Sequence, residues 1–283
     1  MDRKKFVLLT GAAGGIGMAT AAALRAHGME VLAGVLNEAE ADLLVARLGR
    51  EAITPILLDV RDEASIAAAL DRARAAMPAD GRLYALVSNA GVNINAPLGY
   101  LGADEIRLMI DVNLLGTILM VRAVLPLLAP GWSRVVLTGS ATGFVAAPIT
   151  TTYAATKFGI EGFADAMRLE LGAIGVPLSL IEPGVMRTPM TETAPAMLEQ
   201  MLGRMTAADR TIYEPAMRKV VSLSAGPDRG NPPEVVAATI IRALTVTRPA
   251  RRYPVGMDAK AARILGMLPA ALRDWVQRKT FGI

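Results

Sequence analysis

The strongest constraint on the fold is a regular alternation of short apolar runs with longer helical segments. Short apolar runs bounded by turn residues predict buried strands, and apolar residues spaced three or four apart predict helices. Strands that alternate with helices are typical of a parallel sheet covered by helices on both faces. We expect strands at residues 5–10, 30–35, 53–58, 83–88, 134–138 and 177–181, and helices at 15–26, 38–48, 64–77, 104–128, 153–174 and 233–245. The predicted fold is α/β, with one doubly wound domain over residues 1–283.

The alternation lapses after Gly184, where we expect a helical insertion over about residues 186–226. Six of the 15 methionines lie in it, and methionine adapts to irregular apolar shapes. Met197, Met201 and Met205 repeat every four residues beside Leu198 and Leu202, which predicts one soft apolar face. This face could pack the insertion onto the body or cover an apolar substrate. We favour the substrate cover because the insertion follows a strand end.

Composition excludes several kinds of chemistry. The chain has no cysteine and one histidine, His27, so disulfides, thiol catalysis and multi-histidine metal sites are excluded, and we expect no metal. We expect His27 to meet carbonyls at a helix end. No export signal is expected, and the apolar stretch 114–129 contains Arg122 and Pro126, which favours a buried or interface helix over a membrane span. We therefore expect a cytoplasmic protein.

The turn after the first expected strand is rich in glycine. It contains Gly11, Gly14, Gly15 and Gly17, and a helix is expected to begin within it. A helix N-terminus offers free N–H groups and a positive dipole end, and glycines let the backbone approach a pyrophosphate closely. Glycines also make ordinary tight turns, but the strand–turn–helix context favours a dinucleotide site.

Tyr153 and Lys157 are four residues apart in an expected helix and so share one face. A free tyrosine is a poor base at neutral pH, and a nearby ammonium lowers its pKa. Ser140 follows an expected strand and could hold a substrate oxygen. An isolated pair of this kind would be a surface helix pair, but with Ser140 upstream we favour acid–base catalysis.

With these motifs in order, residues 5–190 resemble the short-chain dehydrogenase/reductase family. The resemblance implies a Rossmann fold and a nicotinamide-dependent oxidoreductase that uses Tyr153 as its acid and base. It implies that Asn113, Ser140, Tyr153 and Lys157 are catalytic, with Asn113 supporting a water that links Lys157 to solvent. The implied cofactor-binding residues are Gly11, Gly14, Gly15, Ile16, Gly17, Leu36, Asp59, Val60, Asn89, Ala90, Gly91, Tyr153, Lys157, Pro183, Gly184 and Thr188.

The resemblance also bears on two residues that have simpler structural explanations. Asp59 could cap a helix, and Asn89 could belong to a turn. The family pattern instead implies contact with adenine for Asp59 and with the adenine ribose for Asn89. The end of the second strand, at Leu36 and Asn37, has neither an acidic nor a basic residue. Because a 2′-phosphate needs cationic partners, NAD is expected over NADP, although Arg61 could supply such a cation.

Three stretches, residues 31–36, 182–189 and 252–260, resemble the retinol, hydroxysteroid and 3-hydroxybutyrate dehydrogenase branch. We expect a hydrophobic secondary or allylic alcohol or ketone as substrate, such as a steroid, retinoid, terpenoid or aryl carbinol. The alternatives are a short hydroxy acid, whose carboxylate would need Arg187, Arg204 or Arg210, and an inactive cofactor-binding regulator.

Two surfaces suggest further partners. The expected helix at 104–128 has a wide apolar face on Leu114, Leu115, Ile118, Val121, Leu125 and Leu128, which predicts a homodimer or homotetramer unless the monomer buries it. Residues 248–283 form a basic extension with eight Lys/Arg against two Asp. This extension could be a solvated face, cover the substrate entrance or contact a membrane surface peripherally, and we expect no nucleic-acid partner.

Overall fold

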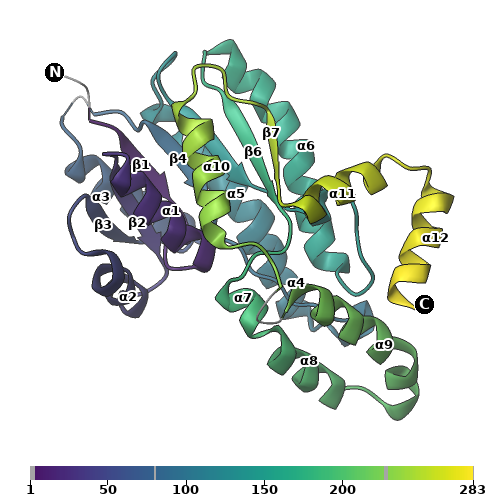
Figure 1. The fold of residues 1–283 in the computed structure, drawn as a ribbon. Coiled ribbons are helices and arrows are strands. Elements are labelled where there is room, and N and C mark those ends of the chain that lie inside the picture. The colour runs from purple at the N-terminus through teal and green to yellow at the C-terminus, as the bar shows by residue number, and fades with distance from the viewer. Residues whose placement is uncertain (1–3, 80, 226–228, 283) are drawn as a thin grey trace.

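The computed structural model describes residues 4–79, 81–225 and 229–282. Within these residues, seven parallel strands form one sheet in the order β3-β2-β1-β4-β5-β6-β7 (Figure 1). The six expected strands are all present, with ends shifted by a few residues. They are β1 (Phe6–Leu9), β2 (Glu30–Val35), β3 (Ile53–Leu57), β4 (Ala85–Ser88), β5 (Arg134–Thr138) and β6 (Leu178–Pro183). The order places the reversal of the sheet between β1 and β4, where doubly wound folds bind ligands.

The seventh strand, β7 (Arg252–Val255), was not predicted. It pairs in parallel with β6, in a register that places Arg252 beside Leu180 and Val255 beside Pro183. The strand has four residues, only one of them buried, so it lacks the apolar run that marked the other strands. The first part of the basic extension therefore contributes a strand to the sheet and is not a separate tail.

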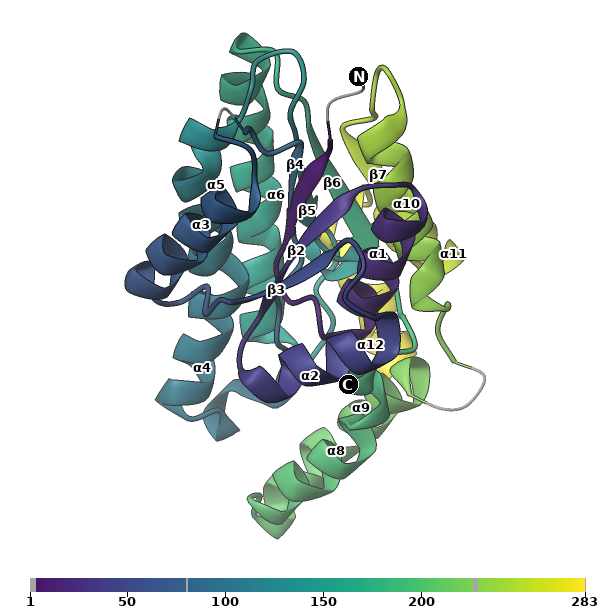
Figure 2. The same cartoon turned by 90° about the vertical axis from the view of Figure 1, so that its left-hand side faces the viewer.

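Helices cover both faces of the sheet (Figure 2). One face packs on buried residues of three helices that include Leu24, Leu44 and Ile240, and the other on three that include Leu70, Met120 and Ile160. Short apolar side chains, many of them alanine, let these helices lie close to the strands. The first set is α1 (Gly15–Ala26), α2 (Glu38–Leu48) and α10 (Pro233–Thr245), and the second is α3 (Glu63–Ala76), α5 (Gly116–Val124) and α6 (Thr151–Ala173).

The long helix expected at residues 104–128 is interrupted. It consists of α4 (Ala103–Ile110), a π-helical turn (Asp111–Leu115), α5 and a final 3₁₀ turn (Leu125–Leu127). Although Ala103–Leu127 is long and apolar enough to cross a membrane by length and composition, half of its most apolar window is buried inside the protein. Val121 and Leu128 are buried in the monomer, so the apolar face predicted for association is narrower than its sequence indicates.

Residues between β6 and α10 form α7 (Pro189–Glu192), α8 (Ala194–Gly203) and α9 (Ala207–Ser224), and the last two project beyond the body (Figure 1). One apolar cluster buries Leu198, Met201 and Leu202 of α8 together with Met205, which lies between α8 and α9. Counted from Leu198, the other three residues follow at spacings of three, four and seven, which define one helical face. Met197 lies off this face, with 38% of its surface exposed. The prediction that Met197 shares an apolar face with Met201 and Met205 was therefore wrong.

The chain ends in α11 (Met257–Gly266) and α12 (Ala270–Phe281), separated at Pro269. Both expose apolar side chains, among them Ile264 and Trp275. Phe281 is buried in the same apolar cluster as Met201 and Met217. The end of α12 thus packs against the α8–α9 segment, which is visible at the right of Figure 1.

Candidate active site

The glycine-rich turn joins β1 to α1 by a tightly packed backbone. Gly11 has a left-handed φ of 64°, and a Cβ atom there would come within 2.8 Å of the Ala90 Cα. A Cβ atom at Gly17 would come within 2.0 Å of the Gly11 carbonyl oxygen. No side chain caps α1, whose N-cap is Gly14, so the positive end of this helix is open to an anion. The geometry of this turn is therefore compatible with a pyrophosphate.

The end of β4 is tied to this turn by hydrogen bonds. The Asn89 backbone N–H donates to Thr10 Oγ1 at 2.9 Å, and the Asn89 side-chain amide donates to the carbonyl oxygens of Thr10 and Gly11 at 3.3 Å each. The Ala90 N–H shares the same Thr10 hydroxyl. Asn89 and Ala90 therefore lie beside the glycine-rich turn.

A carboxylate that sequence reasoning missed lies at the end of β2. Asn37 caps α2 by accepting the Glu40 N–H, and Glu40 Oε2 in turn accepts the Leu36 N–H at 2.8 Å. This reciprocal capping places a negative charge beside Leu36. The asparagine followed three residues later by glutamate was the signal, although no acidic residue directly follows the strand.

An ion pair between Asp59 and Arg61 lies after the end of β3. Arg61 donates through Nε and a terminal nitrogen to the two Asp59 carboxylate oxygens, with a shortest distance of 2.6 Å. This bidentate contact, with the Arg61 backbone N–H, lowers the pKa of Asp59. The cap of α3 is Asp62, so the helix-cap explanation of Asp59 was wrong. Val60 is buried and its Cγ2 would meet a Cβ atom at Gly116, which makes it part of the core under the α5 N-terminus.

Tyr153 and Ser140 meet at the carboxyl ends of the strands. Ser140 follows β5, and its hydroxyl accepts the Thr142 N–H at 3.1 Å, which fixes the turn (Ala141–Gly143) behind it. Burial raises the pKa of the Tyr153 phenol, whereas its hydrogen bond with Ser140 lowers it. In the absence of a bound cation the phenol is therefore protonated at neutral pH.

Lys157 lies one turn further along α6 and is 5% exposed. Its ammonium donates to the Thr138 carbonyl oxygen at 3.0 Å and lies 5.7 Å from the centre of the Tyr153 ring. Burial lowers the pKa of Lys157 to about 8. The site therefore has two titratable groups on one helix face, both shifted by desolvation toward their neutral forms.

Asn113 lies in the π-helical turn and is 1% exposed. Its side chain exchanges two hydrogen bonds with the backbone of Val92, at 2.8 and 2.9 Å, and donates to Thr156 Oγ1 at 3.2 Å. Asn113 thus joins the segment after β4 to the residue next to Lys157. π-Helical turns are rare and are frequent at functional sites.

The segment after β6 closes the site from the other side. Pro183 ends the strand, and Thr188 lies so close to the start of α1 that a Cβ atom at Gly15 would be 2.7 Å from its Cγ2. Ile16, next to Gly15, packs against the apolar cluster under α1. Residues that are far apart in sequence, from Gly11 to Thr188, therefore gather at one edge of the sheet.

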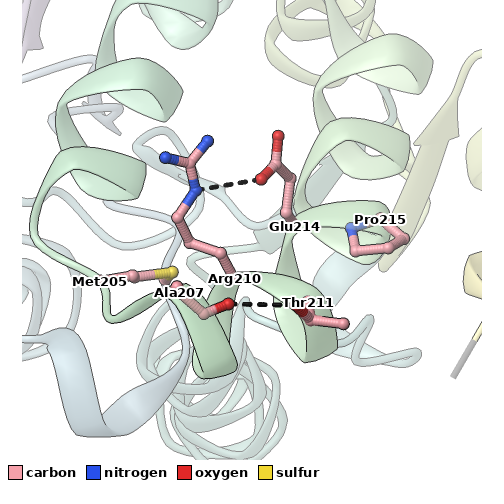
Figure 3. Close-up of a pocket in the computed structure, with 6 residues that line it drawn as sticks. All are labelled: Met205, Ala207, Arg210, Thr211, Glu214 and Pro215. Carbon is pink, nitrogen blue, oxygen red and sulfur yellow. Dashed lines mark hydrogen bonds and ion pairs between the residues drawn. The ribbon is translucent and has the colours of Figure 1, made fainter.

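An apolar cluster lies beside Tyr153. It combines Ile149, Met201, Met205 and Met217 with residues after β4, and the Tyr153 ring packs against it. A depression of about 600 Å³ lies at the start of α9 and holds none of the expected catalytic or cofactor-binding residues, although Met205 and Arg210 line it (Figure 3). There Arg210 pairs with Glu214 at 3.1 Å.

Two further expectations concern residues outside the chemistry. The ring of His27 contacts the Ala23 carbonyl oxygen at 2.8 Å at the end of α1, which confirms the structural interpretation of this histidine. Among the residues that the structure describes, no cluster of three or more histidine or acidic side chains could hold a metal ion.

Comparison with protein families agrees with this arrangement. Residues 5–199 match the model of the short chain dehydrogenase family. The match covers more than half of the chain and contains the glycine-rich turn, Ser140, Tyr153 and Lys157. The chain belongs to the short-chain dehydrogenase/reductase family and is an oxidoreductase.

Characterised and uncharacterised relatives span almost the whole chain. The uncharacterised oxidoreductase YbbO of Escherichia coli is 30% identical, over 96% of this chain and 93% of its own length. Mouse retinol dehydrogenase 5 is 32% identical over 96% and 87%, and human 17-beta-hydroxysteroid dehydrogenase type 6 is 32% identical over 98% and 89%. The expected branch of the family is therefore represented among the relatives.

Solved structures share the fold. A short-chain dehydrogenase from Streptomyces avermitilis superposes with a TM-score of 0.76 at 26% identity, over 99% of this chain and 98% of that one. A Burkholderia phymatum family member in complex with NAD superposes with a TM-score of 0.72 at 22% identity, over 88% of each chain. Family neighbours of this structure therefore bind NAD.

Proposed function

We propose that this oxidoreductase transfers a hydride between NAD and a hydrophobic secondary or allylic alcohol or its ketone, with Tyr153 as general acid and base. The observation that carries the proposal is the contact of Ser140 with Tyr153, one helical turn from Lys157, at the strand ends beside the open N-terminus of α1. A bound nicotinamide would supply the hydride donor or acceptor.

The protein's own groups handle the proton. In carbonyl reduction Ser140 would hold the substrate oxygen while Tyr153 donates its phenolic proton to it. In alcohol oxidation the Tyr153 phenolate would take the hydroxyl proton, and the Lys157 ammonium would favour that phenolate electrostatically. Asn113 would keep the π-helical turn beside Thr156 and Lys157 in place for proton exchange with solvent.

The proposed substrate is apolar because Tyr153 packs against a methionine-rich cluster. A short hydroxy acid would instead need a free cation for its carboxylate. Arg204 pairs with Glu105 at 2.8 Å and Arg210 pairs with Glu214, so two of the three candidate arginines already have acidic partners. Arg187 is the third candidate and keeps the 3-hydroxybutyrate-like alternative testable.

The proposed preference for NAD rests on two charged contacts near the expected adenosine position. Glu40 adds a negative charge beside Leu36, which would repel a 2′-phosphate. Arg61, the cation that could have bound such a phosphate, is occupied by Asp59. Both observations favour a ribose with free hydroxyl groups.

We also propose two interactions that are not part of the chemical step, namely self-association and contact with a membrane surface. Leu115 and Phe158 are exposed on neighbouring helical segments, which favours a homodimer or homotetramer through α4–α6. Ile264 and Trp275 are exposed beside basic residues of α11 and α12, which favours peripheral contact with an anionic membrane by an otherwise cytoplasmic protein.

A panel of steroid, retinoid, aryl and short hydroxy-acid substrates, assayed by cofactor absorbance, tests the substrate. Turnover of the apolar alcohols is expected. Turnover of hydroxy acids alone, lost in Arg187→Ala, would support the alternative. Tyr153→Phe should lower turnover by ~10²–10⁴ while NADH still binds. Wild-type turnover in Tyr153→Phe would show that another group is the acid. If the native protein turned over no substrate of the panel, the result would favour the cofactor-binding regulator.

A further inference from the structure

The stretch from Arg252 to Lys260 resembles the retinol and hydroxysteroid branch, but none of its residues has a role in the proposed chemistry. In the structure it forms β7, a turn at Gly256 and the first residues of α11. Gly256 has a φ of 99°, which is costly for any residue with a side chain. The backbone thus turns sharply and brings Asp258 toward the end of β6.

Asp258 contacts the backbone that follows Pro183. Its Oδ2 atom accepts the Val185 N–H at 2.5 Å. A Cβ atom at Gly184 would lie 2.1 Å from the same oxygen, and one at Gly256 would lie 2.4 Å from Oδ1. A Cβ atom at either glycine would therefore displace this carboxylate, which gives Gly184 a structural role beside its proposed contact with the cofactor.

Other contacts hold the same segment from two sides. The Gly184 N–H donates to the Val255 carbonyl oxygen at 2.9 Å, and Asn231 exchanges backbone hydrogen bonds with Val185 and Arg187, each at 2.9 Å. From Arg187 the chain continues to Thr188, which lies against Gly15. The segment 184–188 therefore runs from the start of α11 to the glycine-rich turn.

The strand before Asp258 is anchored to α6 by charge. Glu182 is fully buried, and Arg252 donates to it at 3.0 Å. The same guanidinium pairs with Glu161 and, at 2.8 Å, with Asp165, both on α6. A buried carboxylate is unstable without such partners. The strand β7, which leads to Asp258, is thus fixed relative to the helix that carries Tyr153 and Lys157.

We propose that Asp258 is a positioning residue for the nicotinamide side of the cofactor site. Its carboxylate holds the backbone of Gly184 and Val185 in the shape that receives the nicotinamide ring, while the glycine-rich turn receives the pyrophosphate. The inference rests on the proposed function, because it assumes that the segment after Pro183 faces the nicotinamide.

The test compares a ligand that has the nicotinamide ring with one that lacks it. The dissociation constants of NADH and ADP-ribose are measured for the native protein, Asp258→Ala, Asp258→Asn and the control Asp274→Ala. Asp274 lies exposed on α12, in the same extension. Asp258→Ala should weaken NADH about tenfold, the size of a lost hydrogen bond to a charged group, and change ADP-ribose by less than about twofold.

Asp258→Asn keeps an acceptor oxygen and the side-chain shape, so it should recover most of the NADH affinity. Equal weakening of both ligands in Asp258→Ala and Asp258→Asn, or no weakening of either, would overturn the inference. Melting temperatures separate a local effect from loss of the fold. Failure of the native protein to bind NADH or NADPH would instead count against the proposed function.

Discussion

Glu40 Oε2 accepts the backbone N–H of Leu36 at 2.8 Å, so a carboxylate from the first turn of α2 reaches back over the end of β2. The strand itself ends without an acidic residue. The charge that a dinucleotide ribose would meet at this position therefore comes from four residues further along the chain.

Replacing Glu40 by Gln should narrow the preference for NADH over NADPH by about tenfold, because it removes a negative charge that opposes the 2′-phosphate. Fluorescence titration with both reduced cofactors measures the ratio. Glu38→Gln is the matched control, since Glu38 is an exposed acidic residue in the same helical turn. An unchanged ratio in Glu40→Gln, or tighter NADPH binding by the native protein, would contradict the proposed role.

The pH dependence of the two reaction directions should differ. Burial raises the pKa of Tyr153, so its protonated form, the donor for carbonyl reduction, predominates at neutral pH. Alcohol oxidation needs the phenolate, so its kcat/KM should rise about tenfold per pH unit below the apparent pKa of the Tyr153–Lys157 pair. Reduction should remain level near neutral pH and fall at higher pH.

Lys157→Met should move the rise in oxidation toward higher pH, because it removes the charge that favours the phenolate. Initial rates across the pH range, with both reaction directions assayed, measure the shift. If Lys157→Met lowered the oxidation rate equally at every pH, without a shift of the pH profile, Lys157 would act only in binding of the cofactor or substrate.

A side chain at Gly17 should not be tolerated without a shift of the backbone. Gly17→Ala should lower the free energy of unfolding by about 1–3 kcal/mol or more, because its Cβ atom would overlap the Gly11 carbonyl oxygen. Gly162→Ala is the control, since nothing lies within 4 Å of a Cβ atom there and the site is within α6. Gly162→Ala should stabilise by about 0.5–1 kcal/mol. Denaturant unfolding of both variants measures the difference, and equal stabilities would refute the packing argument.

Association through α4–α6 should depend on exposed apolar side chains. Phe158 is 45% exposed on α6. Phe158→Glu should convert a dimer or tetramer into a smaller species at micromolar concentration, as measured by light scattering after size exclusion. Glu170→Gln, a substitution at another exposed residue of α6, should leave the mass unchanged. A native protein that is monomeric at that concentration would end the proposal.

Much of the fold could be predicted because its signals are local. Apolar runs such as that ending at Leu9 predict strands, and glycine clusters predict turns, so six of the seven strands in the described residues were expected. The register of Tyr153 and Lys157 likewise follows from helical spacing. β7 could not be predicted in this way, because Arg252 owes its place in a strand to Glu182 and to two acidic residues of α6.

The electrostatic details of the site were the least accessible to sequence reasoning. Asp59 was considered as a cap or an adenine contact, but its partner Arg61 became clear only with side-chain geometry. Glu40 was missed because its carboxylate acts through a backward reach rather than from the end of the strand. Such contacts depend on the backbone and side-chain conformation of a few residues, and the spacing of apolar residues carries no information about that conformation.

The position of β7 has a consequence for the order in which the protein matures. β6 borders the chemical site, yet its outer edge is paired by residues that the ribosome adds some seventy positions later. Until those residues emerge, the polar backbone of that edge has no strand to pair with, and the buried carboxylate of Glu182 lacks Arg252. A nascent chain that already contains Ser140, Tyr153 and Lys157 should therefore remain inactive until β7 has been synthesised and has paired with β6.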